Sequence, residues 1–417
     1  MKAPLLGLAT ASAISGLGTG MTLLAIPWFV LSATGSGLHT GVVVAAETTG
    51  VVLGSVLGGP WIDRLRPRRA AVLFDLAAAP LLAAIPILHH LGALTGWALV
   101  VLAWIIGLTR GPGDAARLVL IPEITKVTAT PVERVTAAHD TPTQAAKALG
   151  APLAGALIAL TGVPAVLLLD ASSFLLSAAI TATALPETTH QHSRSQPRTR
   201  LRQAWNFLRT DRTLQAIMWL AAATNAVNSG LFSVLVPAYG IWILGSSAHI
   251  GALYAVTGTA MITGTLLFTT LGLRLPRWPV LVTCYLLVFA PRSGIFLLQP
   301  PLVVLLIASG VLMLAFGPIN PILAAVRTER TPPRLRARVF ATISATATLA
   351  MPLGTITAGA LGDQLGLMPA LAVFTAAGGL LSLCPLLPAW RRLGAPPHPS
   401  VPSPNLTRSG LTHPAGQ

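Results

Sequence analysis

The chain has 417 residues, of which 53% are hydrophobic and only 9% are charged, and its formal net charge is +15. So few polar groups cannot cover the surface of a water-soluble protein of this length, so the composition excludes an ordinary soluble domain. The basic residues lie between apolar runs rather than among exposed aromatic residues, which argues against a nucleic-acid-binding surface. We therefore expect the lipid bilayer to be the main solvent and expect no nucleic-acid partner.

Twelve apolar segments are long enough to cross a hydrocarbon core of about 30 Å, which needs about 20 residues per helix. The first is too long for the apolar part of a signal peptide, so we interpret it as a spanning helix. These segments predict an all-α integral membrane protein. The segments are residues 4–32, 38–61, 70–91, 94–120, 139–161, 164–186, 213–238, 248–271, 279–299, 301–326, 336–361 and 367–389.

A polar, arginine-containing stretch separates two sets of six segments. We therefore predict an N-terminal six-helix bundle over residues 1–186, a cytoplasmic basic linker over 187–212 and a C-terminal six-helix bundle over 213–390. The Pro-rich tail, residues 391–417, lacks the apolar residues needed for a packed core and is expected to be disordered.

Positive charge is concentrated in the connections that follow even-numbered segments, whereas the connections after odd-numbered segments contain no Lys or Arg. By the positive-inside rule, the even connections and both chain termini lie in the cytoplasm of a protein that spans the cell membrane many times. The residues concerned include Arg64, Arg66, Arg68, Arg69, Arg274, Arg277, Arg327, Arg330, Arg334, Arg336 and Arg338.

The two halves also carry a short sequence repeat. Residues 134–137 (RVTA) resemble residues 338–341 (RVFA), and at the same offset residues 154–157 (AGAL) recur at 358–361. Chance matching of Ala and Gly is the alternative explanation, but the shared offset and orientation argue against it. A duplicated six-helix unit with both copies in one orientation places a substrate site near the midplane, between the halves.

The connection after the second segment reads GPWIDRLRPRR over residues 59–69 and resembles the cytoplasmic signature of the major facilitator superfamily. Arg66 stands where that signature usually has glycine. The resemblance implies that the acid and its neighbouring arginines form a conformational latch against the start of the eleventh helix, whose dipole attracts an anion. The charged positions that match are Asp63, Arg64, Arg68 and Arg69.

Further segments resemble the efflux branch of this superfamily that includes enterobactin-type siderophore exporters and macrolide efflux proteins. They are residues 15–18 (SGLG), 25–28 (AIPW), 116–123 (ARLVLIPE) and 168–176 (LLDASSFLL). The resemblance implies the major facilitator fold, with two pseudo-symmetric six-helix bundles. Fold analogy alone does not identify a substrate.

Gly150, Pro152 and Gly155 in the fifth segment are similar to the Gly-Pro motif that the superfamily's antiporters carry. The resemblance favours export over uptake. The alternative is a purely structural role, because small residues permit close helix packing and a proline can bend a helix within a membrane.

Ionisable groups inside membrane-spanning segments are costly and therefore mark candidate functional sites. Glu47 lies about 14 Å from the start of its segment, at about 1.5 Å per residue, which is close to mid-bilayer. Desolvation would let such a carboxyl hold a proton and release it when water enters, as a proton antiporter requires. We name Glu47 and Asp114 as proton-coupling candidates. The alternative for Glu47 is a permanently protonated acid that donates one hydrogen bond.

Arg110, Asp114 and Arg117 in the fourth segment share one helix face because they are four and three residues apart. Arg110 is the deeper arginine and is a candidate for binding an anionic substrate group or for acting on a nearby acid. Arg117 is expected to pair with Asp75 at the start of the third segment. A structural charge network is the alternative for all of them.

Asparagines supply the main polar groups of the second half. Asn225 and Asn228 in the seventh segment and Asn320 in the tenth are candidates for lining a substrate cavity, or otherwise for hydrogen bonds between helices. Arg292 in the ninth segment is expected to pair locally rather than to contact substrate. The coupling acids are therefore expected in the first half.

These features predict a secondary active transporter that exports a hydrophobic or amphipathic small molecule, such as a drug, a siderophore or a metabolite, by proton antiport with alternating access. The alternatives are a proton-coupled importer or facilitator of a small metabolite, and a membrane sensor or scaffold that does not transport. We find no nucleotide-binding loop, no metal-ligand cluster and no nucleophile motif, so we expect no enzyme activity, no metal and no cofactor. The proton gradient is the expected energy source, and a monomer is the expected functional unit.

Overall fold

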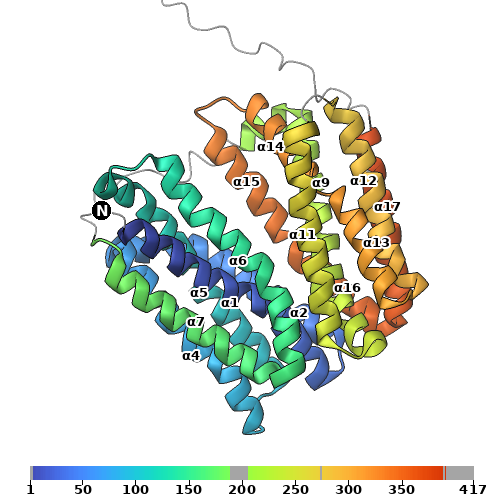
Figure 1. The fold of residues 1–417 in the computed structure, drawn as a ribbon, viewed down its shortest axis with the longest axis horizontal. Helices are drawn as coiled ribbons and strands as arrows, with labels where there is room; N and C mark the ends of the chain where they lie inside the picture. Colours follow the sequence, from blue (N-terminus) through green and yellow to red (C-terminus); the bar gives the residue numbers. More distant parts are fainter. Residues whose placement is uncertain (1–2, 188–204, 273–274, 388–389, 391–417) are drawn as a thin grey trace, which may run out of the picture.

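The computed structural model describes residues 3–187, 205–272, 275–387 and Trp390, and these contain helices but no strand. Twelve helical segments in this part are long and apolar enough to cross a membrane. The predicted all-α, twelve-span architecture is therefore confirmed. Figure 1 shows the two sets of helices as two bundles side by side.

Six spans form the first bundle. They are α1 (Ala3–Thr34), α2 (Gly37–Leu57), α4 (Pro67–His90), α5 (Gly96–Thr128), α6 (Val132–Thr161) and α7 (Val163–Ala184). A short helix, α3 (Gly59–Leu65), follows α2 at the arginine-containing connection. We call the end of the molecule that carries α3 the arginine-rich end.

The second bundle contains more interrupted helices. Its seventh span comprises α9 (Arg212–Gly230), η1 (Leu231–Leu235), α10 (Val236–Tyr239) and η2 (Gly240–Leu244). The other spans are α11 (Ser247–Leu271), α12 (Arg277–Gly294) with η4 (Ile295–Leu298), α13 (Leu302–Leu314) with α14 (Ile319–Arg330), α15 (Arg336–Leu349) with α16 (Met351–Leu365), and α17 (Leu367–Leu383) with η5 (Cys384–Leu386).

Hydropathy located these spans well but missed some of their ends and breaks. Helices α5 and α6 extend about two turns further toward the arginine-rich end than predicted, because residues such as Glu123 and Glu133 continue the helix without adding hydrophobicity. The tenth and eleventh spans are each divided, and a proline lies at each division, at Pro318 and Pro352. Proline lacks the N–H group that would continue the helical hydrogen bonds.

Close contact between α2 and α5 brings two charged side chains together. Gly50 packs directly against Gly107 and the carbonyl group of Trp104, where a Cβ atom would clash. Small residues of this kind let two helix backbones approach closely within a membrane. Because α2 and α5 cross at this point, Glu47 on one helix can reach Arg110 on the other.

The two bundles touch through α2 and α16 on one side and through α6 and α11 on the other, away from the arginine-rich end (Figure 1). The Asp363 carboxylate accepts hydrogen bonds from Ser36 Oγ at 2.6 Å, from Gly37 N at 2.6 Å and from Leu38 N at 3.1 Å. An acid from the end of α16 therefore caps the first turn of α2, where the helix dipole favours a negative charge.

On the other side of the contact, Gly155 of α6 packs on Gly251 of α11, and Ser247 Oγ donates a hydrogen bond of 3.0 Å to the Gly155 carbonyl oxygen. Both contacts use small residues, so backbone meets backbone with little side-chain volume between the halves. The halves are thus held together at the end opposite the arginines.

Candidate functional site

A buried ion pair joins α2 and α5 in the first bundle. Arg110 Nη1 lies 2.5 Å from Glu47 Oε1, and the two side chains are only 9% and 16% exposed. The Arg110 guanidinium also lies 5.7 Å from the centre of the Phe174 ring on α7. Two of the predicted site residues, named for separate roles, therefore form one unit.

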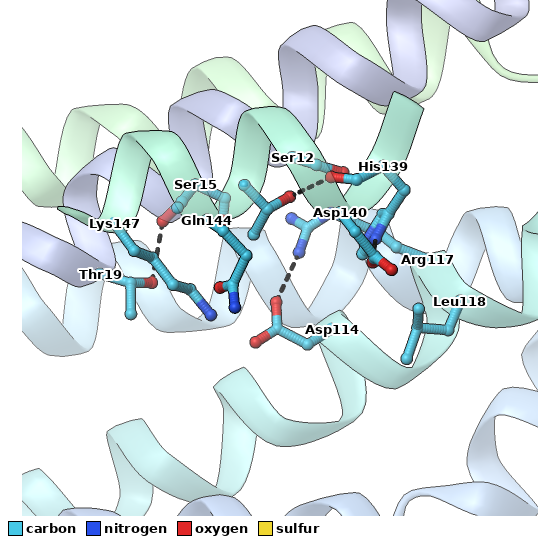
Figure 2. Close-up of a pocket in the computed structure, with 12 residues that line it drawn as sticks. Ser12, Ser15, Thr19, Asp114, Arg117, Leu118, His139, Asp140, Gln144 and Lys147 are labelled. Atoms are coloured by element: carbon cyan, nitrogen blue, oxygen red, sulfur yellow. Dashed lines mark hydrogen bonds and ion pairs between the residues drawn. The ribbon is translucent and has the colours of Figure 1, made fainter. Parts of the chain in front are cut away.

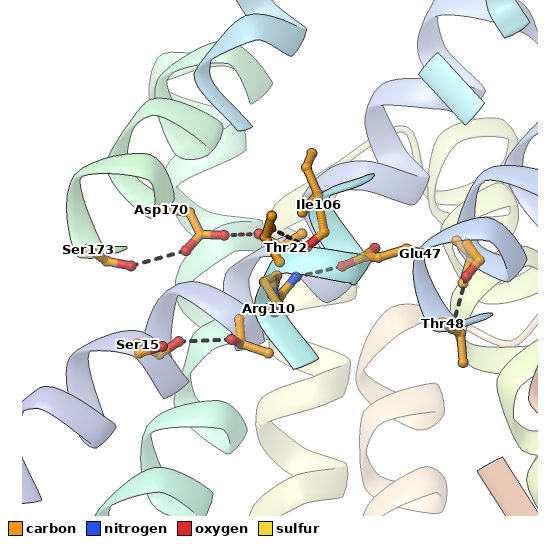
Figure 3. Close-up of polar contacts among 11 residues, drawn as sticks. Ser15, Thr22, Glu47, Thr48, Ile106, Arg110, Asp170 and Ser173 are labelled. Atoms are coloured by element: carbon orange, nitrogen blue, oxygen red, sulfur yellow. Dashed lines mark hydrogen bonds and ion pairs between the residues drawn. The ribbon is translucent and has the colours of Figure 1, made fainter. Parts of the chain in front are cut away.

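A second carboxylate lies on the other side of Arg110, as Figure 3 shows. Asp170 of α7 is fully buried, accepts a hydrogen bond from Thr22 Oγ1, and accepts another from Ser173 Oγ at 3.1 Å. Both Glu47 and Asp170 interact electrostatically with Arg110. We call Glu47, Arg110 and Asp170 the buried acid cluster.

Asp170 is not among the predicted functional residues, although it belongs to the segment 168–176 that resembles the efflux branch. It lies well inside a span and is ionisable, so the rule that selected Glu47 also applies to it. Its position beside Arg110 depends on how α1, α5 and α7 pack, and no pattern in one helix carries that information.

A separate charge network connects helices in the arginine-rich half of the first bundle. Arg117 is 2% exposed, donates to Asp75 Oδ2, donates to Ser177 Oγ at 2.9 Å and lies 3.0 Å from Asp114 Oδ1. Asp75 is almost completely buried, whereas the Asp114 side chain is 57% exposed. Asp114 therefore interacts with Arg117 rather than with Arg110 and stands apart from the buried acid cluster.

A pocket of about 370 Å³ opens between α1, α5 and α6, and Figure 2 shows the side chains that line it. We call it the N-half pocket. Asp114 lines it from α5, and His139, Asp140 and Lys147 line it from α6. Its walls are therefore rich in charge, with half-exposed carboxylates on two different helices.

A second pocket, of about 230 Å³, lies among α9, α12, α14 and α15 of the second bundle, and we call it the C-half pocket. The three predicted asparagines, Asn225, Asn228 and Asn320, all line it. Aromatic residues Tyr285 and Phe289 form part of the same wall. Apart from Arg327, this pocket offers amide groups and aromatic rings, whereas the N-half pocket offers carboxylates.

Arg292 of α12 lies beneath the C-half pocket and is 4% exposed. Its Nη2 atom donates to Asn228 Oδ1, and its guanidinium lies 4.7 Å from the centre of the Phe232 ring. Asn228 thus serves as a local partner of a buried arginine while it also borders the pocket. An amide and an aromatic face stabilise this cation without a neighbouring carboxylate in the described residues.

The connection between α2 and α4 keeps an unusual backbone conformation. Arg66, where the family signature usually has glycine, adopts φ 70° between α3 and α4. Positive φ disfavours residues that carry a Cβ atom. Asp63 and Arg64 lie in α3, Arg68 donates a hydrogen bond to the Ala182 carbonyl oxygen, and Arg69 lies 3.6 Å from Glu187.

The glycines of the antiporter-like segment occupy two different helix contacts. Gly150 packs against Gly20 of α1, within the first bundle, whereas Gly155 forms the contact with α11 of the second bundle. The carbonyl group of Pro152 also faces Gly251. The segment therefore links packing inside one half to the contact between the halves.

Two six-helix bundles in one chain, with polar pockets in each half and charges buried within the spans, define a membrane transporter of the secondary class. The family model described as "Major Facilitator Superfamily" matches residues 8–301 and 218–413, and the chain belongs to this superfamily. The suspected resemblance is therefore confirmed.

Characterised relatives include proteins named "Multidrug efflux pump Tap". The one from Mycobacterium tuberculosis (strain ATCC 25618 / H37Rv) is 28% identical over 409 residues, covering 94% of this chain and 96% of the relative. The one from Mycolicibacterium fortuitum is 26% identical over 381 residues, covering 88% and 91%. The similarity thus extends over nearly the whole of both chains.

Solved structures share the fold at low sequence identity. The nucleoside transporter NupG has a TM-score of 0.70 at 15% identity, covering 93% of this chain and 98% of its own. A D-xylose-proton symporter has a TM-score of 0.69 at 16% identity, with coverages of 92% and 96%. These similarities establish the fold and carry no information on substrate.

Proposed function

We propose that this protein exports hydrophobic or amphipathic small molecules across the cell membrane, in exchange for protons, by alternating access between its two halves. The observation that carries the proton-coupling part is the buried acid cluster, in which Glu47 is paired with the Arg110 guanidinium and a second buried carboxyl group, Asp170, feels the charge of the same arginine. The export direction is supported by the relatives named as multidrug efflux pumps, which match almost the full chain.

The charge count of the buried acid cluster explains how it could handle a proton. If Glu47 and Asp170 were both ionised beside Arg110, the cluster would hold one uncompensated negative charge in a medium of low dielectric constant. One proton on either of the two acids removes this charge. Entry of water, or a change in the packing of α2 against α5, would favour release of that proton.

We place the arginine-rich end, and with it both chain termini, on the cytoplasmic side. The connections after even-numbered spans carry the arginines, and this asymmetry sets the orientation of membrane proteins. The contacts around Asp363 and Gly155 would then close the outer side of the transporter. We further propose that a monomer is the functional unit, because both halves of the substrate path belong to one chain.

Transport by inside-out membrane vesicles tests this function. Vesicles that contain the protein are expected to accumulate compounds from a panel of antibiotics, siderophores and fluorescent dyes when their interior is acidic, and to stop when the pH gradient is collapsed. Vesicles with the double substitution Glu47→Gln and Asp170→Asn serve as the control. Accumulation that ignores the gradient and runs equally in both directions would instead identify a facilitator.

The contact around Asp363 gives a prediction about the alternation between conformations whose outer side is closed and open. Asp363→Ala removes three hydrogen bonds to the start of α2 and is expected to shift the balance between closed and open outer sides by about tenfold toward the open form. Spin labels at the exposed neighbours Thr34 and Gln364 are then expected to report a longer distance. The labels require a background without Cys284 and Cys384.

Glu329→Ala is the matched control for this experiment. Glu329 pairs with Arg277 at 2.7 Å within the second bundle, so its loss removes a carboxylate without touching the contact between halves. The distance between the labels is expected to stay unchanged in this control. An unchanged distance in the Asp363→Ala variant as well would show that the outer contact does not govern opening.

A further inference from the structure

The two pockets occupy equivalent places in the two halves of the molecule. The residues of α1 that line the N-half pocket have the same spacing as the residues of α9 that line the C-half pocket. If the halves are a duplicated unit, as the short sequence repeat indicates, the two pockets are two copies of one surface. The matching positions are Ser12, Gly16 and Thr19 on one side and Ala221, Asn225 and Asn228 on the other.

The same correspondence holds on the helices that face α1 and α9. Asp140 and Gln144 of α6 line the N-half pocket, and Ser344 and Thr348 of α15 line the C-half pocket at the same spacing. This offset is the one that relates residues 134–137 to residues 338–341 in the repeat. Two helices from each half therefore support the equivalence independently.

The chemistry of the two copies has diverged in charge. On α6 the N-half pocket has a carboxylate, Asp140, where the C-half pocket has a hydroxyl, Ser344. At this equivalent position the first half has an acid and the second half has a hydroxyl. The lining of the N-half pocket also includes Asp114 of α5, whereas the lining of the C-half pocket includes Arg327 and no carboxylate.

The acids of the N-half pocket are not fully occupied by internal partners. Arg117 is already paired with the buried Asp75, so Asp114 adds a second carboxylate to one guanidinium. Asp140 lies 2.8 Å from the His139 ring, and its side chain is 57% exposed. Counted together with the buried Asp75, the group holds three carboxylates against two cations, Arg117 and Lys147, and so has an excess of about one negative charge.

A polar group without a partner lies in the same wall. Ser12 is 3% exposed, and its hydroxyl has no hydrogen-bond partner in the described part of the chain. Buried hydroxyl groups are normally satisfied, and an orphaned one in a pocket wall is typical of a place that a ligand or water completes. Charge and hydrogen-bonding capacity thus both indicate a binding surface.

We propose that the N-half pocket binds the protonated amine of an amphipathic substrate through Asp114 and Asp140, while the C-half pocket contacts the uncharged aromatic or hydrogen-bonding part of the same class of molecule. This inference rests on the proposed export function and specifies its substrate class. An amine bound by two carboxylates from different helices is held by charge-assisted hydrogen bonds, whereas Asn320 and Phe289 offer an amide and a ring face to a neutral group.

Equilibrium binding by the full-length protein in detergent, with no proton gradient, tests the proposal. The probes are a dansyl fluorophore that carries a primary amine on a short linker, and the same compound with a hydroxyl in place of the amine. The wild-type protein is expected to bind the amine about tenfold more tightly. The double variant Asp114→Asn and Asp140→Asn is expected to bind both probes alike, with its affinity for the neutral probe unchanged.

Two controls separate the two pockets. Lys147→Met removes the opposing charge at the N-half pocket and is expected to raise the preference for the amine. Asn320→Ala is expected to weaken binding of both probes by the same factor, because Asn320 lies at the C-half pocket, whose lining includes no carboxylate. If the double variant does not fold, Asp140→Asn alone replaces it. This single variant is expected to lose half as much of the preference for the amine probe.

Equal affinity of the wild-type protein for the two probes would overturn the proposal, and so would a preference for the amine that survives in the aspartate variants. Neither result would bear on proton-driven export, which the vesicle experiment tests with other compounds and another variant. Failure of that experiment with a retained amine preference would remove the export function and leave the binding site.

Discussion

Glu47→Gln is expected to lower gradient-driven export by at least about tenfold while leaving the protein folded and able to bind substrate. The glutamine side chain keeps the size of the glutamate and can still accept a hydrogen bond from Arg110, but it cannot take up or release a proton. The measurement is substrate accumulation in proteoliposomes under an imposed pH gradient. It is paired with exchange of labelled for unlabelled substrate at equal pH.

Substrate exchange at equal pH separates the coupling of transport to protons from the conformational change that carries substrate across the membrane. If the buried acid cluster carries the proton, exchange should continue in the Glu47→Gln variant although accumulation stops. Asp170→Asn should behave in the same way, because Asp170 is the second buried acid that interacts electrostatically with Arg110. Glu123→Gln is the matched control, since Glu123 pairs with Lys126 at the end of α5. Normal accumulation by the Glu47→Gln variant would exclude this acid from coupling.

Arg117→Met is expected to destabilise the protein by about 3–5 kcal/mol, the cost of leaving a buried carboxylate without its partner. Asp75 is almost fully buried, and Arg117 is the cation that pairs with it. The double variant Asp75→Asn with Arg117→Met should recover much of the loss, because it removes both charges. The measurement is thermal unfolding of the purified protein in detergent, followed through tryptophan fluorescence.

A surface pair provides the reference for this effect. Lys126→Met removes the partner of Glu123, which lies 3.4 Å away at an exposed position, and should change stability by less than about 1 kcal/mol. A loss of stability in Arg117→Met no larger than in Lys126→Met would contradict a structural role for the network around Arg117.

The number and approximate position of the spans could be predicted from sequence because each span must be apolar over its whole crossing. The ends were less accurate where the helix leaves the apolar layer, as at Glu123 and Glu133, since hydropathy follows hydrophobicity and not helix formation. At Pro318 the sequence shows a residue that disfavours a continuous helix, but the division of the tenth span at this point was not predicted.

The candidate site was less predictable than the fold. Glu47 and Arg110 were each found because charge inside a span is rare, yet their direct pairing depends on the rotation of α2 against α5, which the contact at Gly50 sets. Asp114 was grouped with Glu47 on the basis of residue type, and the structure places it instead beside Arg117 at an exposed pocket. Which charged side chains pair with each other thus depends on how the helices pack and cannot be read from the sequence of one helix.

The lack of carboxylates in the lining of the C-half pocket has a consequence for how this transporter can change over generations. All the carboxylates of the buried acid cluster lie in the first half, and the second half has only Glu329 and Asp363 after residue 212, both near helix ends. Substitutions around Asn225 and Asn320 can therefore alter which neutral groups fit without touching the acids. If the acids carry the proton as proposed, a population exposed to a new toxic compound can widen its export range at this wall without altering the coupling residues.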